Sequence, residues 1–256
     1  MEYCHFVNVD PETKQERMQH ITPDFPYGAD LCDLHIFPGN TFPWHWHREL
    51  EVFYMRKGSL TYHLPCGAVT FSQGEGGFIN SNILHKTTCA PESACIQEEQ
   101  QFLPEFVGVN SLLQRKYVQP ILSSPELSFI KFDPATPEHR PLLELLCSSY
   151  RLYEEKPEGY ELELPQRLLQ FWRLLFELTQ PLHKSGHTSA DDQRIKQMLT
   201  FIAAHYAEPL QLSQIAAAAY MSPRACGRCF QSRLGTTPTA YLTDYRTQQA
   251  GQLLAD

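Results

Sequence analysis

Short apolar runs separated by turn residues fill the first hundred positions of the chain. Between about Ala29 and Gln100 the runs read LCDLHIF, ELEVFYM, SLTYHL, AVTF and GGFIN, with glycine, proline and asparagine between them. Runs of this length, rich in β-branched and aromatic residues, are typical of strands in an antiparallel barrel or sandwich. We therefore expect an all-β N-terminal domain.

Apolar residues return at helical spacing after residue 100. The two series are Leu142, Leu143, Leu145, Leu146 and Tyr150, and then Leu164, Leu168, Phe171, Trp172, Leu175 and Leu178. This spacing predicts two helices joined around KPEGY. The broad apolar face around Trp172 leaves two interpretations open: it packs against the protein's own barrel, or it forms a helix-to-helix contact in a homodimer.

Three further helices are predicted near the C-terminus. The first carries an apolar face made of Ile195, Met198, Leu199, Ile202 and Tyr206. Ser213 to Ala218 predicts a second, short helix. Ser222 and Pro223 predict the start of the third, because serine caps free N–H groups and proline suits the first helical turn. Gly235 predicts its end.

The third of these helices presents a polar face. This face contains, at i, i+3, i+4 and i+7, the residues Arg224, Gly227, Arg228 and Gln231. Arginine and glutamine on an exposed helix that follows a short helix and a tight turn suit base edges and phosphates of DNA. From these residues alone, a merely solvated polar face stays equally open.

From Ile195 to Leu254 the chain closely resembles the first helix-turn-helix of AraC/XylS-type transcription regulators. The matching positions are Ala216, Met221, Ser222, Arg228, Phe230, Gly235 to Pro238, Tyr241, Arg246, Ala250, Leu253 and Leu254. The resemblance implies a recognition helix in the major groove, with a DNA-binding face made of Ser222, Arg224, Ala225, Gly227, Arg228 and Gln231. That family carries two such units joined by a long helix, whereas this chain stops at Asp256. We therefore expect an incomplete DNA-binding domain without the second unit.

Two histidines and a glutamate alternate in the stretch WHWHRELEV, residues 44–52. The spacing that resembles the first motif of cupin barrels is formed by Gly39, His45, His47, Glu51 and Gly58. A weaker second motif, GEGGFINSNILH, places His85 where the third histidine is expected. Alternate side chains of a strand share a face, so both histidines and the glutamate are expected to point into one barrel.

The predicted barrel has three open uses: to hold a metal, to hold an organic effector, or neither. The candidate metal ligands are His45, His47, Glu51 and His85, a suitable set for Zn²⁺, Ni²⁺, Mn²⁺ or Fe²⁺, and a divalent transition metal is the candidate cofactor. The candidate effector pocket is lined by Phe42, His45, His47, Glu51, Tyr54, His63, Phe78 and His85. For each of these added side chains, a core position is the alternative. Sensor domains of AraC-type regulators often retain an HxHxE-like strand while using the barrel for an organic effector.

Composition and charge narrow the class of protein. The chain has 256 residues, 42% hydrophobic and 20% charged, as in an ordinary globular protein of two domains. No apolar run reaches the ~20 residues of a membrane span, and the N-terminus lacks the basic and apolar regions of a secretory signal, which favours a cytoplasmic location. The net charge is −8, yet four arginines against one aspartate lie between Ser222 and Arg246. The eight scattered cysteines are interpreted as reduced thiols, and the CxxC of Cys226 and Cys229 as packing residues.

These patterns predict an α+β multidomain protein. An N-terminal cupin, a jelly-roll-like β-barrel, is followed by a helical dimerisation segment and then by an all-α helix-turn-helix domain. The expected boundaries are residues 1–125 for the cupin-like sensing domain, 126–184 for the helical dimerisation and linker segment, and 185–256 for the helix-turn-helix domain. The polar stretch HKSGHTSADD, residues 183–192, is the predicted linker.

The predicted function is a non-enzymatic, sequence-specific DNA-binding transcriptional regulator of the AraC type, whose barrel senses a small-molecule effector or a metal. The expected partners are a double-stranded DNA operator, the effector, a second copy of the chain in a homodimer, and RNA polymerase, with no membrane. Two alternatives stay open. One is a metal-dependent cupin enzyme, an isomerase or dioxygenase, and the other is a degenerate barrel that only dimerises.

Overall fold

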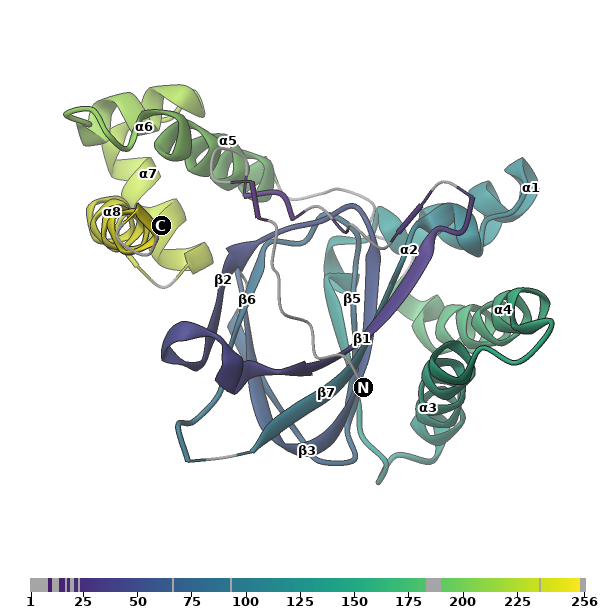
Figure 1. Cartoon of the computed structure of the whole chain (residues 1–256). Coiled ribbons are helices and arrows are strands. Elements are labelled where there is room, and N and C mark those ends of the chain that lie inside the picture. The colour runs from purple at the N-terminus through teal and green to yellow at the C-terminus, as the bar shows by residue number, and fades with distance from the viewer. Residues whose placement is uncertain are drawn as a thin grey trace.

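A β-barrel occupies the centre of the molecule, with one pair of helices on one side and a cluster of four helices on the other (Figure 1). The computed structural model describes residues 9–10, 14–16, 18, 21–22, 24–65, 67–92, 94–182, 190–234 and 236–253. Sheet followed by helices confirms the predicted α+β class. Among the described residues, no helix is both long enough and apolar enough to cross a membrane.

In the part of the chain that the structure describes, eight antiparallel strands build the barrel. They are β1 (Tyr27–Asp33), β2 (Thr41–His45), β3 (Leu50–Leu64), β4 (Gly67–Ser72), β5 (Gly76–Ile79), β6 (His85–Thr88), β7 (Cys95–Phe102) and β8 (Phe129–Phe132). One half of the barrel has the order β1-β7-β3-β5-β8, and in the other half β2 pairs with β6 while β6 and β4 pair with β3. The long strand β3 therefore belongs to both halves. Strand β8 carries the barrel beyond residue 125 and into the segment predicted to be helical.

An irregularity in β3 decides which of its side chains face the barrel interior. The register between β3 and β7 shifts between Met55 and Lys57. Before this bulge Phe53 and Met55 are fully buried, and after it Leu60, Tyr62 and Leu64 are buried instead. Because side chains alternate along a strand, one extra residue exchanges odd for even positions on the inner face.

Helices α3 (Arg140–Glu155) and α4 (Tyr160–Thr179) cover the outer face of the sheet. They bury a core in which Trp172 of α4 meets Phe78 of β5 edge to face, with ring centroids 6.1 Å apart. Each large side chain buried there contributes about 1.5–3 kcal/mol. Of the two interpretations of the apolar face around Trp172, the structure supports packing against the protein's own barrel. Along the chain, the short helices α1 (Ser111–Leu113) and α2 (Gln119–Leu122), joined by a π-helical turn, lie between β7 and β8.

Four helices form the C-terminal domain: α5 (Ala190–His205), α6 (Leu212–Ala218), α7 (Pro223–Leu234) and α8 (Pro238–Leu253). The Oγ of Ser222 accepts a hydrogen bond from the backbone N–H of Ala225 at 3.3 Å, so α7 has the serine cap that the sequence predicted. The side chains of Cys226 and Cys229 are buried in the core of this domain. The predicted helix end at Gly235 and most of the predicted linker lie outside the described residues.

Candidate metal centre and nucleic-acid interface

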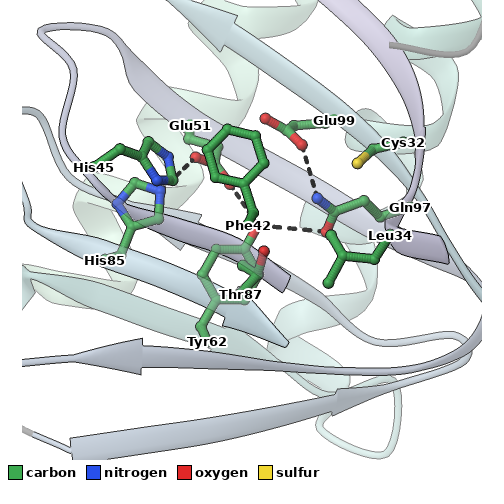
Figure 2. A pocket seen from close by; sticks show the side chains of 10 residues that line it. All are labelled: Cys32, Leu34, Phe42, His45, Glu51, Tyr62, His85, Thr87, Gln97 and Glu99. Atoms are coloured by element: carbon green, nitrogen blue, oxygen red, sulfur yellow. Dashed lines mark hydrogen bonds and ion pairs between the residues drawn. The ribbon is translucent and has the colours of Figure 1, made fainter. Parts of the chain in front are cut away.

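A small cavity lies inside the barrel. Its walls are Cys32, Leu34, Phe42, His45, Glu51, Tyr62, His85, Thr87, Gln97 and Glu99. Figure 2 shows the two histidines and Glu51 at one end of this cavity and Gln97 and Glu99 at the other. The volume is about 20 Å³, whereas one water molecule needs ~10–15 Å³ on this scale. The cavity therefore has room for an ion or one or two waters, and organic ligands need far larger pockets.

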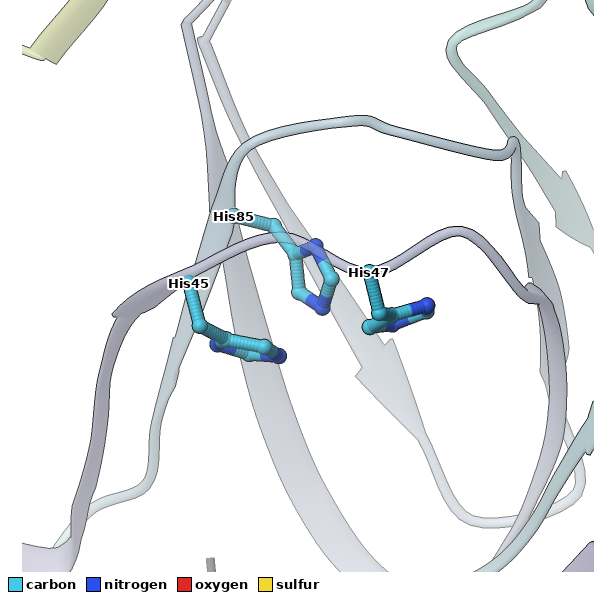
Figure 3. Close-up of side chains that lie close together, drawn as sticks. All are labelled: His45, His47 and His85. Atoms are coloured by element: carbon cyan, nitrogen blue, oxygen red, sulfur yellow. The ribbon is translucent and has the colours of Figure 1, made fainter. Parts of the chain in front are cut away.

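Three buried histidines gather at that end of the cavity. His45 ends β2, His47 lies two residues further along, and His85 begins β6, where it pairs with His45 across the two strands. Figure 3 shows the ring of His85 between the other two rings. One ring nitrogen from each histidine lies within 4.8 Å of the other two. Two segments that are separate in sequence thus bring three potential metal ligands together.

Backbone carbonyls fix the proton on each of these rings. The Nδ1 atoms of His45, His47 and His85 lie 2.9, 3.0 and 2.8 Å from the carbonyl oxygens of Pro43, Glu49 and Ile83. A carbonyl oxygen only accepts, so each Nδ1 carries a hydrogen and donates it. In a neutral imidazole the Nε2 atom is then left with a lone pair, which is the arrangement found in metal-binding histidines.

The carboxylate of Glu51 faces these Nε2 atoms. Its Oε2 lies 3.1 Å from Nε2 of His47 and 3.3 Å from Nε2 of His85, while its Oε1 accepts a 2.5 Å hydrogen bond from the Tyr62 hydroxyl. Burial opposes the charged form of Glu51, yet its interactions with His47 and His85 hold its pKa well below the usual range. A carboxylate and neutral Nε2 lone pairs repel each other unless a proton or a metal cation lies between them.

Two further glutamates lie near the histidine cluster and the cavity. Oε2 of Glu16, from the segment before the barrel, lies 3.5 Å from Nε2 of His45. Burial raises the pKa of Glu16 to about 7. Burial, together with the charges of Glu51 and Glu16, also raises the pKa of Glu99 well above its ordinary value. A cation in the cavity would favour the charged forms of these carboxyl groups.

The imidazoles differ in how readily they take up a proton. Burial lowers the pKa of His45 well below its ordinary value. Burial also disfavours the charged form of His47, but the hydrogen bond and charge of Glu51 outweigh it and raise the pKa of His47. The three nitrogens and the Glu51 carboxylate form a donor set that fits Zn²⁺, Ni²⁺, Mn²⁺ or Fe²⁺. Protons and a metal ion would therefore compete for the same lone pairs.

Five of the eight residues predicted to form the effector pocket come together, and three do not. Phe42, His45, Glu51 and His85 line the cavity, and His47 completes the histidine cluster. The other three, Tyr54, His63 and Phe78, were placed in the pocket wrongly.

Strand alternation and the bulge explain these errors. Tyr54 is three residues from the inward Glu51 and so lies on the opposite face, where it packs beside the α3–α4 core. Phe78 is paired with the outward Val52 and contacts Trp172. His63 follows the bulge and bonds to Thr88 at 2.8 Å outside the cavity.

Several residues of the cavity and the histidine cluster were not predicted from the sequence. Tyr62 faces inward only because of the bulge in β3, which no sequence motif marks. Gln97 and Glu99 alternate along CIQEEQQF, and polar residues two apart in a barrel strand were a usable signal for them. No pattern pointed to Glu16, which lies far from the cupin-like motifs.

Helix α7 presents the predicted DNA-binding face to solvent. Ser222, Arg224, Arg228 and Gln231 are exposed, and Ala225 and Gly227 are half-buried. A side chain added at Gly227 would meet nothing within 4 Å, so this face of the helix is open. The guanidinium of Arg246 instead donates to the carbonyls of Tyr206 and Glu208, each at 2.7 Å, and so ties α8 to the end of α5.

Known proteins resemble both parts of the chain. No family model matches the sequence. The chain is 28% identical over 240 residues to YdeC, an uncharacterised HTH-type transcriptional regulator of Bacillus subtilis, and the match covers 94% of this chain and 82% of the relative. This relative and the helix-turn-helix of α6 and α7 confirm the prediction of a transcriptional regulator of the helix-turn-helix type.

Solved structures match more distantly. ToxT of Vibrio cholerae with a bound unsaturated fatty acid gives a TM-score of 0.43 at 12% identity, over 88% of this chain and 97% of that chain. The AraC-like activator CuxR gives 0.35 at 11% identity, over 88% and 73%. A cupin-2 domain protein of Shewanella frigidimarina gives 0.27 at 24% identity, over 34% and 78%.

Proposed function

We propose that this helix-turn-helix transcriptional regulator is of the AraC type, binds an operator in double-stranded DNA through α7, and senses a divalent transition metal ion in its barrel. One observation carries the sensing part. Three Nε2 lone pairs and the Oε2 of Glu51 converge in a buried cavity of about 20 Å³. Such a convergence of acceptors is satisfied by a small cation.

Each residue of the cluster has a definite part in holding the ion. His45, His47 and His85 supply Nε2, and Glu51 supplies Oε2. The carbonyls of Pro43, Glu49 and Ile83 orient the rings, and Tyr62 orients the carboxylate. When bound, the ion supplies the positive charge that draws these acceptors together.

A metal acts as an effector only if it binds two arrangements of the protein with different affinity. Such differential binding changes the affinity for DNA by the same factor by which DNA changes the affinity for metal. A homodimer, contact with RNA polymerase and a cytoplasmic location belong to the same proposal. Because the apolar face of α4 packs on the barrel, the proposed dimer contact uses another surface, and sedimentation analysis of the purified chain tests for it.

The size of the cavity weighs against the two rival functions. A space of about 20 Å³ does not admit an organic effector or a substrate beside the metal. A metal-dependent cupin enzyme would need more space for its substrate than this cavity offers. If the enzyme alternative holds, the loaded protein turns over a substrate and loses that turnover in His45→Ala.

Elemental analysis of the protein, purified without a histidine tag, tests the metal site. We expect close to one divalent transition metal ion per chain after incubation with Zn²⁺ and gel filtration, and a loss of that metal in the double variant His45→Ala/His47→Ala. His63→Ala is the matched control, because its side chain bonds to Thr88 outside the cavity, and it should keep the metal. No metal in the wild type, or equal metal in the double variant, would refute the assignment.

A further inference from the structure

The DNA-binding domain packs on a small set of residues in and beside the barrel. We name this set the docking surface: Lys14, Trp44, Trp46 and Leu84. Leu84 is 3% exposed and belongs to the apolar core that α5, α6, α7 and α8 otherwise form. Trp44 and Trp46 pack against the same core. The Nζ of Lys14 lies 3.6 Å from the centroid of the Tyr245 ring in α8. Figure 1 shows these helices beside β2 and β6, the strands that Trp44 and Leu84 adjoin.

Each docking residue is a near neighbour, along the chain, of a residue of the cavity. Trp44 and Trp46 flank His45, and Trp46 also precedes His47. Leu84 precedes His85 in the same way. Successive side chains of an extended chain point to opposite sides, so the cavity and the docking surface are the two faces of the same short segments.

The segment before the barrel contacts both the histidine cluster and the DNA-binding domain. Glu16 points at His45, whereas Lys14, two residues earlier, covers Tyr245. Hydrogen bonds join this segment to the tryptophan strand, because the Trp46 N–H donates to the Lys14 carbonyl at 3.0 Å and the Glu16 N–H donates to the Trp46 carbonyl at 2.9 Å. The histidine segment and the Lys14–Glu16 segment are therefore joined directly by backbone hydrogen bonds.

We infer that the docking surface couples the histidine cluster to the DNA-binding domain. An ion held by three imidazoles fixes their positions through short bonds. A single residue, Trp46, separates His45 from His47, and the interior is close-packed. A shift of these rings therefore changes how Trp44, Trp46 and Leu84 pack on α5–α8. The inference rests on the proposed metal sensing and names the path by which that sensing reaches α7.

The tryptophans of the docking surface report on this coupling directly. The chain has three tryptophans, and the third, Trp172, lies in the α3–α4 core beside Phe78. In a Trp172→Phe background, the fluorescence of the full chain comes from Trp44 and Trp46. Zn²⁺ does not quench by electron transfer, so a change in emission on Zn²⁺ titration reports a change in their surroundings.

We expect the emission maximum to shift and to saturate at one equivalent of Zn²⁺. The shift should be absent in Trp172→Phe/His45→Ala/His47→Ala. Bound Zn²⁺, measured on the same samples by competition with a chelating dye, separates the two hypotheses. No bound Zn²⁺ overturns the proposed metal sensing and the coupling with it, whereas bound Zn²⁺ without any shift overturns the coupling alone.

Affinity for DNA supplies the second test. A duplex selected by the wild-type chain from a random pool is titrated with and without Zn²⁺, and we expect its Kd to change at least fivefold. In Trp46→Ala, Zn²⁺ affinity should stay within threefold of the wild type while the Zn²⁺-dependent change in Kd disappears. Arg48→Ala is the matched control, because Arg48 lies in the same segment with its side chain exposed, and it should keep the full change.

The variants also guard against unfolding. If Trp46→Ala loses its cooperative thermal transition, Trp44→Leu is the milder variant for measuring the Zn²⁺-dependent change in Kd, because Trp44 is half-buried. A Zn²⁺-dependent change in Kd that persists in folded Trp46→Ala and in folded Trp44→Leu would overturn the inference.

Discussion

Replacing Glu51 with glutamine separates metal binding from folding. In the wild type, Oε2 of Glu51 faces Nε2 of His47 and of His85, and Oε1 accepts from Tyr62. A glutamine of the same shape offers N–H donors to the two lone pairs and a carbonyl to the tyrosine hydroxyl. Every one of these groups is then satisfied without a cation.

The expected magnitudes follow from these contacts. A neutral hydrogen bond contributes about 0.5–1.5 kcal/mol, so the amide can replace what the carboxylate provided, and the unfolding free energy of the metal-free protein should fall by less than about 1 kcal/mol or rise. Metal binding loses a charged ligand. Removing a group that merely supports a ligand lowers metal affinity about 10–100-fold, so Glu51→Gln should reach at least the upper end of that range, or about 2.8 kcal/mol at 1.4 kcal/mol per tenfold.

Urea denaturation in EDTA and Zn²⁺ competition titration measure the two quantities on the same samples. The unfolding free energy measured at acidic pH provides a third test. Because the pKa of Glu51 is lowered in the folded state, the stability that its charge contributes is present above pH ~4.5 and is lost as the pH falls below that value. Glu51→Gln should lack this component. A metal-free variant destabilised by several kcal/mol, or unchanged Zn²⁺ affinity, would refute the hydrogen positions and the ligand role assigned here.

Three further predictions concern other parts of the molecule. Burial raises the pKa of Glu16 to about 7, so the unfolding free energy of the metal-free protein should fall as the pH rises from about 4.5 to 7. Glu16→Gln should remove that fall and so gain about 3 kcal/mol at pH 8, measured by urea denaturation. Equal pH profiles of the wild type and the variant would contradict this prediction. Arg228→Ala should weaken binding to the selected duplex by about 1–3 kcal/mol if Arg228 contacts a base. If Arg228 contacts a phosphate, the variant should reduce the slope of log affinity against log salt concentration by about one. Fluorescence anisotropy measures both quantities, and no change in either would mean that this face of α7 points away from DNA. Phe78→Ala should lower the unfolding free energy by about 3–5 kcal/mol, because the side chain is fully buried against Trp172. The variant should leave the Zn²⁺ stoichiometry of the folded protein unchanged. Loss of the bound metal would instead indicate that Phe78 lines the cavity.

The order of the elements and the identity of the three histidines could be predicted from the sequence, because both depend on local patterns. The spacing from His45 to Glu51 and the serine–proline start of α7 are short-range signals that the structure keeps. The wall of the cavity was harder to predict. Its composition depends on the bulge between Met55 and Lys57, which puts Tyr62 inside and His63 outside.

Long-range contacts explain the rest of what sequence reasoning missed. Glu16 reaches His45 only because a separate segment runs beside Trp46. In the same way, the alternation in WHWH predicted which side chains turn away from the barrel but not what covers them. That cover, the core of the DNA-binding domain, depends on how two domains pack, which periodicity along one strand does not encode.

X-ray absorption spectroscopy of the Zn²⁺-loaded chain tests the central claim most directly. A zinc ion at the histidine cluster should show nitrogen and oxygen ligands at about 2.0–2.2 Å, with the outer-shell scattering of imidazole and no sulfur. Sulfur ligands at about 2.3 Å would place the metal on cysteines, outside the donor set assigned to it. That result, or a spectrum of zinc held by water alone, would contradict a metal sensor in the barrel.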